Sequence, residues 1–230
     1  LMNDSHSLIA LQGPNSRDIL NKVCSDTIDL PFYHFMKTKL LNQSVILTRT
    51  GYTGELGFEI LGKHDIIKEL WDYFINHNVS PAGLAVRDIL RMEMKYCLYG
   101  NDISKNTNPL EAGLSWIVNF NKGNFLGKDN LLKSKNNDYQ RRLIGFEMIE
   151  KAIPRKGYSV YIDCNNMQRM KVGEVTSGTH SPVLSKGIGL AYIDCPYHKI
   201  GSSIYIEIRG KFLGAKIVKT PFIQNTSLHK

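Results

Sequence analysis

The N-terminal part of the chain alternates short apolar runs with turn residues, and each run predicts a β-strand. The first run, Ser7–Leu11, is followed by a short helix to about Val23 that Asn15 or Ser16 can cap. Turn residues bound the later strands. These strands are expected at Phe32–Leu40, at Ser44–Thr48 after a turn at Asn42 and Gln43, and at Leu56–Leu61.

Two later stretches have the spacing of amphipathic helices. Asp65–His77 carries one apolar stripe, formed by Ile66, Ile67, Leu70, Trp71, Phe74 and Ile75. Leu84–Lys95 is expected to be a mostly buried helix, because apolar residues recur along it at Leu84, Ile89, Leu90, Met92 and Met94. The order strand, helix, strands, helix indicates an α+β layer with an antiparallel sheet.

The pattern changes after Trp116. Gly127–Lys135 predicts one short polar helix, and from Arg142 onward the chain contains strand-like segments separated by Gly and Pro. Short strands at close spacing are typical of a small barrel or sandwich, so we expect a domain boundary near residue 135. The segments include Leu143–Met148, Tyr158–Ile162, Lys171–Thr176, Gly187–Ile193, Ser203–Ile208 and Ala215–Lys219.

Composition narrows the class of protein. With 42% hydrophobic and 22% charged residues, the chain can bury a core. It has no apolar run of bilayer-spanning length and no signal-peptide pattern at its start, so we expect a soluble intracellular protein without a membrane partner. The net charge of +8 suits an acidic partner or polyanionic ligand, although a solvated surface is the usual meaning. No aromatic-and-basic RNA motif is present, so nucleic acid is not expected as a partner.

Residues that often carry chemistry form no recognisable constellation. The four cysteines, Cys24, Cys97, Cys164 and Cys195, are scattered without C-x-x-C or zinc spacing, and we interpret them as ordinary thiols in a reducing compartment. No metal site is expected. No Ser/His/Asp triad or reactive cysteine motif stands out. Asp102 is interpreted as a turn former rather than as a general base.

The stretch Gly51–Glu59, GYTGELGFE, is the best candidate for a ligand site. Gly51, Gly54 and Gly57 bracket a turn between two strands, and glycine permits positive φ and close approach of the backbone to a ligand. It is not a nucleotide loop, since it lacks both G-x-G-x-x-G before a helix and the Lys-Ser/Thr of a P-loop. Spacing alone predicts either a plain hairpin or a buried small-molecule site.

The two glutamates of this stretch differ in their setting. Glu55 lies at the turn, where a solvated carboxylate costs little. Glu59 lies between Phe58 and Ile60, and strand alternation puts it on the opposite face. On a covered face its charge must be paired, and a carboxylate that accepts two parallel N–H bonds suits an aminopyrimidine edge. On an open face Glu59 would be an ordinary surface residue.

Arginine and tryptophan residues add further candidates. Arg87 and Arg91 are one helical turn apart with Asp88 beside them, which usually indicates a surface salt-bridge face. In a buried helix, however, an arginine needs an anionic partner or several acceptors. Trp116 can stack on a flat ligand, although a core tryptophan is the commoner meaning.

Several motifs follow one another in a single order along the chain. They are LIALQGP (8–14), RTGYTGELGFEI (49–60), GLAVRDILRMEMKYCLYGNDI (83–103), NPLEAGLSWIV (108–118), GEVTSGTHSPVL (173–184), GIGLAYI (187–193) and KTPFI (219–223). Together they closely resemble the aminomethyltransferase, or T protein, of the glycine cleavage system. Because the motifs occur in register over nearly the whole chain, the resemblance is far more specific than any one of them.

The resemblance implies a fold, a reaction and partners. The family has three domains around a central folate-binding hole, which implies that 1–86 completes the first folate-binding domain, 87–135 is part of the second, and 136–230 is a C-terminal β-barrel domain. The family moves a one-carbon unit from the aminomethyl-lipoyl arm of H protein to tetrahydrofolate and releases ammonia. Tetrahydrofolate and lipoylated H protein are therefore implied, in the cytoplasm of a bacterium or the mitochondrial matrix of a eukaryote.

By the same resemblance, four residues bind folate or substrate. Glu59 is the motif glutamate that binds the pterin ring, Arg87 contacts folate, and Tyr52 and Trp116 line the folate pocket. Family members also carry a further N-terminal region with a catalytic aspartate, and often a tyrosine near the C-terminus that touches the substrate. This chain has a counterpart of neither residue, so we assign no catalytic residue within it.

Other functions within the superfamily are alternatives. A non-catalytic folate-binding module could act in iron–sulfur maintenance or tRNA modification, but the iron–sulfur relatives carry K-G-C-Y-x-G-Q-E where this chain reads R-T-G-Y-T-G-E-L-G. A folate-linked domain of a sarcosine-type dehydrogenase is less favoured, because the chain has no flavin-binding motif.

We expect the chain by itself to be inactive, because the family's catalytic aspartate has no counterpart in it. The measurement is formation of methylenetetrahydrofolate from lipoylated H protein and tetrahydrofolate, with a full-length T protein as the positive control. Detectable product from the 230-residue chain would contradict this expectation.

Overall fold

The structure is a computed structural model that describes residues 4–24, 27–136, 140–164 and 168–229. The chain divides into two compact units. The first unit consists of Leu1–Arg91 together with Gln224–Lys230, and the second consists of Met92–Ile223. The last segment of the chain therefore belongs with its beginning. The finer division into the three ranges expected from the sequence stays a prediction.

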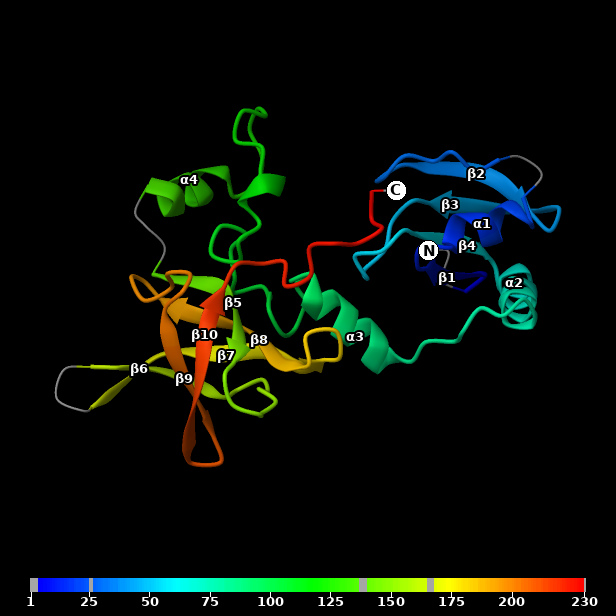
Figure 1. Ribbon diagram of the computed structural model, residues 1–230. Helices are drawn as coiled ribbons and strands as arrows, with labels where there is room; N and C mark the ends of the chain where they lie inside the picture. The colour runs from blue at the N-terminus through cyan, green and yellow to red at the C-terminus, as the bar shows by residue number, and fades with distance from the viewer. Residues whose placement is uncertain (1–3, 25–26, 137–139, 165–167, 230) are drawn as a thin grey trace. The chain divides into compact units, whose positions relative to one another are not determined.

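The first unit is built on a four-stranded antiparallel sheet with the order β1-β4-β3-β2 (Figure 1). β1 is thus an edge strand, and it pairs with β4 rather than with β2, the next strand in the chain. Burial alternates along the strands, as expected for a sheet with one face on a core. The strands are β1 (His6–Gln12), β2 (Phe35–Leu40), β3 (Gln43–Thr48) and β4 (Gly57–Lys63).

One face of this sheet forms the core of the first unit. Phe58 and Ile60 of β4 are fully buried and lie opposite Leu11 and Ile9 of β1. Two helices, α1 (Ser16–Asn21) and α2 (His64–Asn76), contribute side chains to the same cluster. Their buried members are Leu20, Ile67, Leu70 and Phe74.

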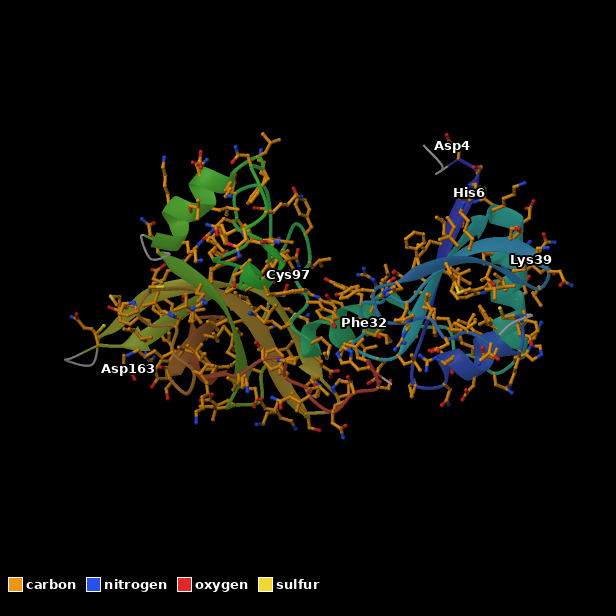
Figure 2. All side chains as sticks on the ribbon, turned by 90° about the horizontal axis from the view of Figure 1, so that it is seen from above. Asp4, His6, Phe32, Lys39, Cys97 and Asp163 are labelled. Atoms are coloured by element: carbon orange, nitrogen blue, oxygen red, sulfur yellow. The ribbon has the colours of Figure 1, made fainter. Side chains whose placement is uncertain are left out.

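The opposite face of the sheet carries Glu59. This residue lies opposite Ala10 of β1 and Thr48 of β3, so its side chain leaves the sheet away from the core, as strand alternation predicts. Figure 2 draws the side chains and labels His6 on β1 and Lys39 on β2, the two edge strands. Glu59 itself is half-buried.

The second unit contains a closed barrel of antiparallel strands in the order β10-β5-β8-β7-β6-β9 (Figure 1). Its interior is apolar, with Phe146 and Val160 fully buried. The strands are β5 (Arg141–Met148), β6 (Ser159–Asp163), β7 (Arg169–Ser181), β8 (Lys186–Asp194), β9 (Ser203–Ile208) and β10 (Lys211–Val218). Asp163, labelled in Figure 2, ends β6, and its carboxylate lies 3.2 Å from Arg169 Nε at the start of β7.

Hydrogen bonds connect the segment around Asp102, which precedes the barrel, to the barrel strands β7 and β8. Asp102 is fully buried, and its carboxylate accepts hydrogen bonds from the Leu98 N–H at 2.9 Å and from the Thr176 hydroxyl at 2.5 Å. The Asp102 carbonyl accepts a further bond from the Tyr192 hydroxyl at 2.9 Å. The interpretation as a turn former is therefore confirmed, and the same side chain also satisfies a buried strand hydroxyl. Shorter elements of this region are η1 (Ser115–Ile117) and α4 (Lys128–Asn136).

The predicted fold class is confirmed, since an antiparallel α+β layer is followed by an all-β barrel. Some boundaries differ for local reasons. β2 begins at Phe35 rather than Phe32, because Tyr33 has a φ of 62°, which an extended strand does not adopt. β7 continues past Thr176 to Ser181, because it pairs with β8 along that length.

The helix α3 (Leu84–Glu93) is less buried than its composition predicts. Leu84 and Val86 are exposed, and burial becomes complete only near the C-terminal end, at Arg91 and Met92. The reason is that the apolar residues of the first turns line an open cavity, which is described below, rather than a core. Across the described ranges, no helix is both long and apolar enough to cross a membrane.

Candidate functional site

The loop between β3 and β4 is shaped around a side chain from β1. A Cβ atom placed on Gly51 would lie 2.1 Å from Gln12 Oε1, and one placed on Gly57 would lie 2.0 Å from the same atom. Both distances are far inside van der Waals contact, so any larger residue would displace the glutamine. Gly54, between them, has a φ of 77°, which glycine adopts without strain. The glycine spacing thus admits the Gln12 side chain.

Gln12 uses its whole amide group to hold this loop. Its Nε2 donates to the carbonyls of Thr50 at 3.2 Å and Phe58 at 3.1 Å. Its Oε1 accepts a bond from the Thr53 hydroxyl at 3.2 Å. A glutamine amide offers two N–H donors and one carbonyl acceptor, and all three are engaged.

The carboxylate of Glu59 is fixed from the neighbouring strand. The Thr50 hydroxyl donates to Glu59 Oε2, and it lies 2.6 Å from the hydroxyl of Thr48. This short hydroxyl chain orients one oxygen of the carboxylate. An ionised carboxylate accepts several hydrogen bonds, so Glu59 keeps capacity for a ligand.

A cavity of about 380 Å³ lies in the first unit beside the edge strand β1. Its polar lining includes Gln12, Tyr52, Glu59 and Arg87. The cavity also has an apolar wall, formed by Trp71, Phe74 and Ile75 of α2 and by Val79, Pro81 and Leu84. Its size and its mixture of an apolar wall with a few polar groups are typical of small-molecule sites.

The apolar stripe of α2 serves both the core and this cavity. Ile67, Leu70 and Phe74 are buried, whereas Trp71 is 47% exposed and Ile75 is 37% exposed. Both exposed residues line the cavity. The stripe predicted from helical spacing is therefore confirmed, but part of it is available to a ligand.

The two arginines of α3 have different surroundings. The Arg87 guanidinium carbon lies 4.4 Å from the centroid of the Tyr52 ring, in cation–π contact, and the arginine is exposed. Arg91 is 1% exposed, and its Nε donates to the Asp88 carboxylate at 2.7 Å. Arg91 is thus the buried arginine that needs an anionic partner, and Arg87 lies at the cavity.

Trp116 belongs to a different unit from the other predicted site residues. It lies in η1 of the second unit, is 71% exposed, and does not line the cavity. The interpretation of Trp116 as a core residue is therefore wrong. The structure groups Tyr52, Glu59 and Arg87 around one cavity of the first unit.

Glu55 also differs from its interpretation as a solvated turn residue. The Ser227 N–H donates to Glu55 Oε2 at 2.9 Å, and the Ser227 hydroxyl donates to the same carboxylate. The Leu56 N–H in turn donates to the Ser227 hydroxyl oxygen at 2.9 Å. The cause is long-range, because residues 224–230 belong to the first unit and return to this loop.

Residues near the C-terminus also contact the first unit through Leu228 and His229. Arg49 is buried, and its Nη2 donates to the Leu228 carbonyl at 2.8 Å. Burial lowers the pKa of the Arg49 guanidinium, and Arg17 lowers it further, but an arginine remains charged at neutral pH. The His229 ring lies 5.1 Å from Phe32, which is labelled in Figure 2, in an edge-to-face arrangement.

Sequence reasoning missed Gln12, Thr50 and Ser227. For Gln12 a signal was present, because glycines at both ends of a loop indicate that another segment approaches closely. For Thr50 and Ser227 the sequence offers no signal, since their roles depend on strand register and on a partner far along the chain. The four cysteines form no disulfide within the described ranges, and the residues of those ranges contain no His, Cys, Asp and Glu group that could hold a metal ion.

An antiparallel sheet unit with a polar cavity and a β-barrel unit define the class of the fold, and comparison with known proteins specifies its family. The GCVT N-terminal domain family model matches residues 1–122, and the glycine cleavage T-protein C-terminal barrel domain model matches residues 141–224. The chain belongs to the glycine cleavage T-protein family.

Individual relatives agree with this assignment. The chain is 45% identical over 225 residues to an aminomethyltransferase of Halothermothrix orenii, covering 96% of this chain and 62% of that protein. It is 44% identical over 227 residues to an aminomethyltransferase of Thermoanaerobacter pseudethanolicus, covering 96% and 60%. The crystal structure of glycine cleavage system aminomethyltransferase T from Bartonella henselae has a TM-score of 0.87 at 30% identity, covering 96% of this chain and 60% of that chain. The chain thus spans about three fifths of the length of the curated relatives it matches.

We expect Ser227→Ala to lower the free energy of unfolding by about 1–3 kcal/mol, because the buried Leu56 N–H loses its acceptor. Urea denaturation measures the change. Ser203→Ala, on an exposed strand position of the barrel, is the matched control and is expected to change stability by less than about 0.5 kcal/mol. Equal effects of the two substitutions would contradict a specific role for Ser227.

Proposed function

We propose that this chain is the folate-binding part of a glycine cleavage aminomethyltransferase. The reaction moves the aminomethyl carbon from lipoylated H protein to tetrahydrofolate, with release of ammonia. The observation that supports this most is that Tyr52, Glu59 and Arg87 line one cavity in a member of the T-protein family. The names of the relatives favour this reaction over a non-catalytic folate-binding module. Such a protein acts in the bacterial cytoplasm or the mitochondrial matrix.

The cavity offers groups that match the parts of a reduced folate. The Glu59 carboxylate, held by Thr50, can accept two parallel N–H bonds from the aminopyrimidine edge of a pterin. The apolar wall that includes Trp71 can cover the flat ring system. The exposed guanidinium of Arg87 can form an ion pair with a carboxylate of the glutamate tail. The Tyr52 ring stacks against this guanidinium and holds it in place.

Binding and orientation are the contributions that these residues make to the reaction. The folate amine must be held close to the aminomethyl carbon, and such positioning supplies a large share of the acceleration in reactions between two bound groups. A carboxylate near that amine would stabilise positive charge that develops there. Glu59 is assigned to the pterin edge, so we give it an orienting role and assign no residue of this chain to the chemical step.

A cluster of lysine and arginine side chains in the second unit supports the proposal of an acidic protein partner. Lys151, Arg155, Arg209 and Lys211 line a hollow of about 460 Å³ on the barrel. None of the four forms an ion pair with another residue in the described part of the chain. Like charges gathered around one concave surface attract an oppositely charged partner and steer its approach. We therefore propose that an acidic surface of H protein binds at this hollow.

We expect Glu59→Ala to weaken tetrahydrofolate binding tenfold or more, which corresponds to about 1.4 kcal/mol. Isothermal titration calorimetry with the 230-residue chain measures the affinity. Glu69→Ala, at an exposed position of α2 outside the cavity, removes the same charge and is the matched control. Unchanged affinity in Glu59→Ala would remove this residue from the site, and no binding by the unmodified chain would contradict the proposed function itself.

We expect Lys151→Glu to weaken the association with lipoylated H protein several-fold, with a loss that shrinks as ionic strength rises. The reason is that the substitution places a negative charge inside the basic hollow. Surface plasmon resonance at low and high salt measures the effect. Lys171→Glu, at an exposed position of β7 outside the hollow, gives the same change in net charge. Equal weakening by both variants would show a general charge effect and no local docking.

A further inference from the structure

We propose that Gln12 is a positioning residue that holds Glu59 and Tyr52 in their ligand-binding geometry. This inference rests on the proposed folate site and adds to it a residue that acts through others. Gln12 is the last residue of β1, and its side chain enters the loop whose two ends are Gly51 and Gly57.

The hydrogen bonds of Gln12 reach Glu59 by two routes. The Phe58 carbonyl, which accepts the 3.1 Å bond, belongs to the peptide group that joins Phe58 to Glu59. The Thr50 carbonyl accepts the other bond, at 3.2 Å, and the Thr50 hydroxyl donates to the Glu59 carboxylate. One amide nitrogen thus fixes both the backbone that carries Glu59 and the residue that orients its charged group.

A third contact reaches the segment that carries Tyr52. Gln12 Oε1 accepts a bond from the hydroxyl of Thr53, which directly follows Tyr52 in the chain. The Thr53 hydroxyl oxygen also accepts a bond from the Glu55 N–H at 3.2 Å. The glutamine and this threonine therefore span the loop from its first residues to its middle.

The chemistry of these contacts is specific for glutamine. The position needs two donors aimed at two carbonyl oxygens and one acceptor aimed at a hydroxyl, at the length of this side chain. Glutamate has the same length, but its carboxylate would face the carbonyls of Thr50 and Phe58 without an N–H to offer. Methionine has a similar length and offers neither strong donors nor a strong acceptor. Both substitutions therefore remove the bonds to the carbonyls of Thr50 and Phe58. Glutamate keeps an acceptor for the Thr53 hydroxyl and adds a charge, whereas methionine loses that bond as well.

The space around the side chain supports the same assignment. Because a Cβ at Gly51 or Gly57 would overlap Gln12 Oε1, the loop closes around the glutamine rather than around a void. Gln12 also lines the cavity, so the loop that it holds borders the space for a ligand. Loss of the hydrogen bonds would release the loop without emptying a hydrophobic core.

Binding measurements in two backgrounds test the positioning role. We expect Gln12→Met to weaken tetrahydrofolate binding by about tenfold in the otherwise unmodified chain. When Glu59→Ala is already present the loss is expected to shrink to about threefold or less, because only the contact through Thr53 to the Tyr52 segment remains. Gln12→Glu is expected to follow the same pattern and serves as a second variant if Gln12→Met folds poorly. Ile67→Val, in the core of the first unit, is the control for a loss of stability that leaves the loop intact. An equal loss of affinity in both backgrounds would overturn the proposal.

Hydrogen exchange gives a readout that does not depend on folate. In Gln12→Met we expect the amides of residues 51–58 to exchange at least about tenfold faster, while those of α2 keep their rates. Unchanged exchange in the loop would overturn the proposal, whatever the ligand is. Faster exchange in the loop, together with no folate binding by the unmodified chain, would instead reject the proposed function and leave Gln12 as the residue that orders the loop.

Discussion

The hydrogen bonds between the Gln12 amide and the carbonyls of Thr50 and Phe58 are the interaction on which the candidate site depends. They exist because the β1–β4 register places Gln12 opposite Gly57, where no side chain blocks its path. A shift of one residue would turn every side chain of β1 to the other face and send Leu11 out of the core. The apolar pattern of β1 therefore also determines where its polar last residue lies.

Paired polar groups of the second unit contrast with the groups that line the Glu59 cavity and the basic hollow. In the second unit the Ser181 hydroxyl donates to the Glu93 carboxylate at 2.5 Å. The Arg141 guanidinium pairs with Glu111, and this hydrogen bond raises the arginine pKa. These groups satisfy one another and hold the fold. Other charged groups line the Glu59 cavity and the basic hollow of the barrel, where they keep capacity for further hydrogen bonds or ion pairs.

Much of the fold could be predicted from the sequence, because it depends on local pattern. The strands and helices of both units follow from alternation, helical spacing and turn residues, and Glu59 could be placed on the face opposite Phe58 and Ile60 by its position between them. The errors concern relations between distant segments. The helix α3 was expected to be mostly buried, but its first turns are exposed, because burial depends on where the core ends along the helix and helical spacing does not record that.

The candidate site was predicted less completely than the fold. The resemblance of motifs selected Tyr52, Glu59 and Arg87, and the structure brings these three together around one cavity. The same resemblance selected Trp116, which belongs to the second unit, and its role at a folate site stays a prediction. The supporting residues Gln12 and Thr50 were not predicted. The glycines at 51 and 57 signalled a close approach without identifying the approaching residue, and the bond from Thr50 to Glu59 depends on how the two strands pair.

The return of residues 224–230 to the first unit has a consequence for the order in which the protein folds on the ribosome. The bond between Ser227 and Glu55 joins residues 172 positions apart, and the whole second unit is synthesised between them. At ordinary translation rates the Glu55 loop therefore waits roughly 10 to 30 s for its partner. During that interval the sheet of the first unit can form from contiguous sequence, but the loop beside the candidate site reaches its final state last, after the barrel strands have emerged.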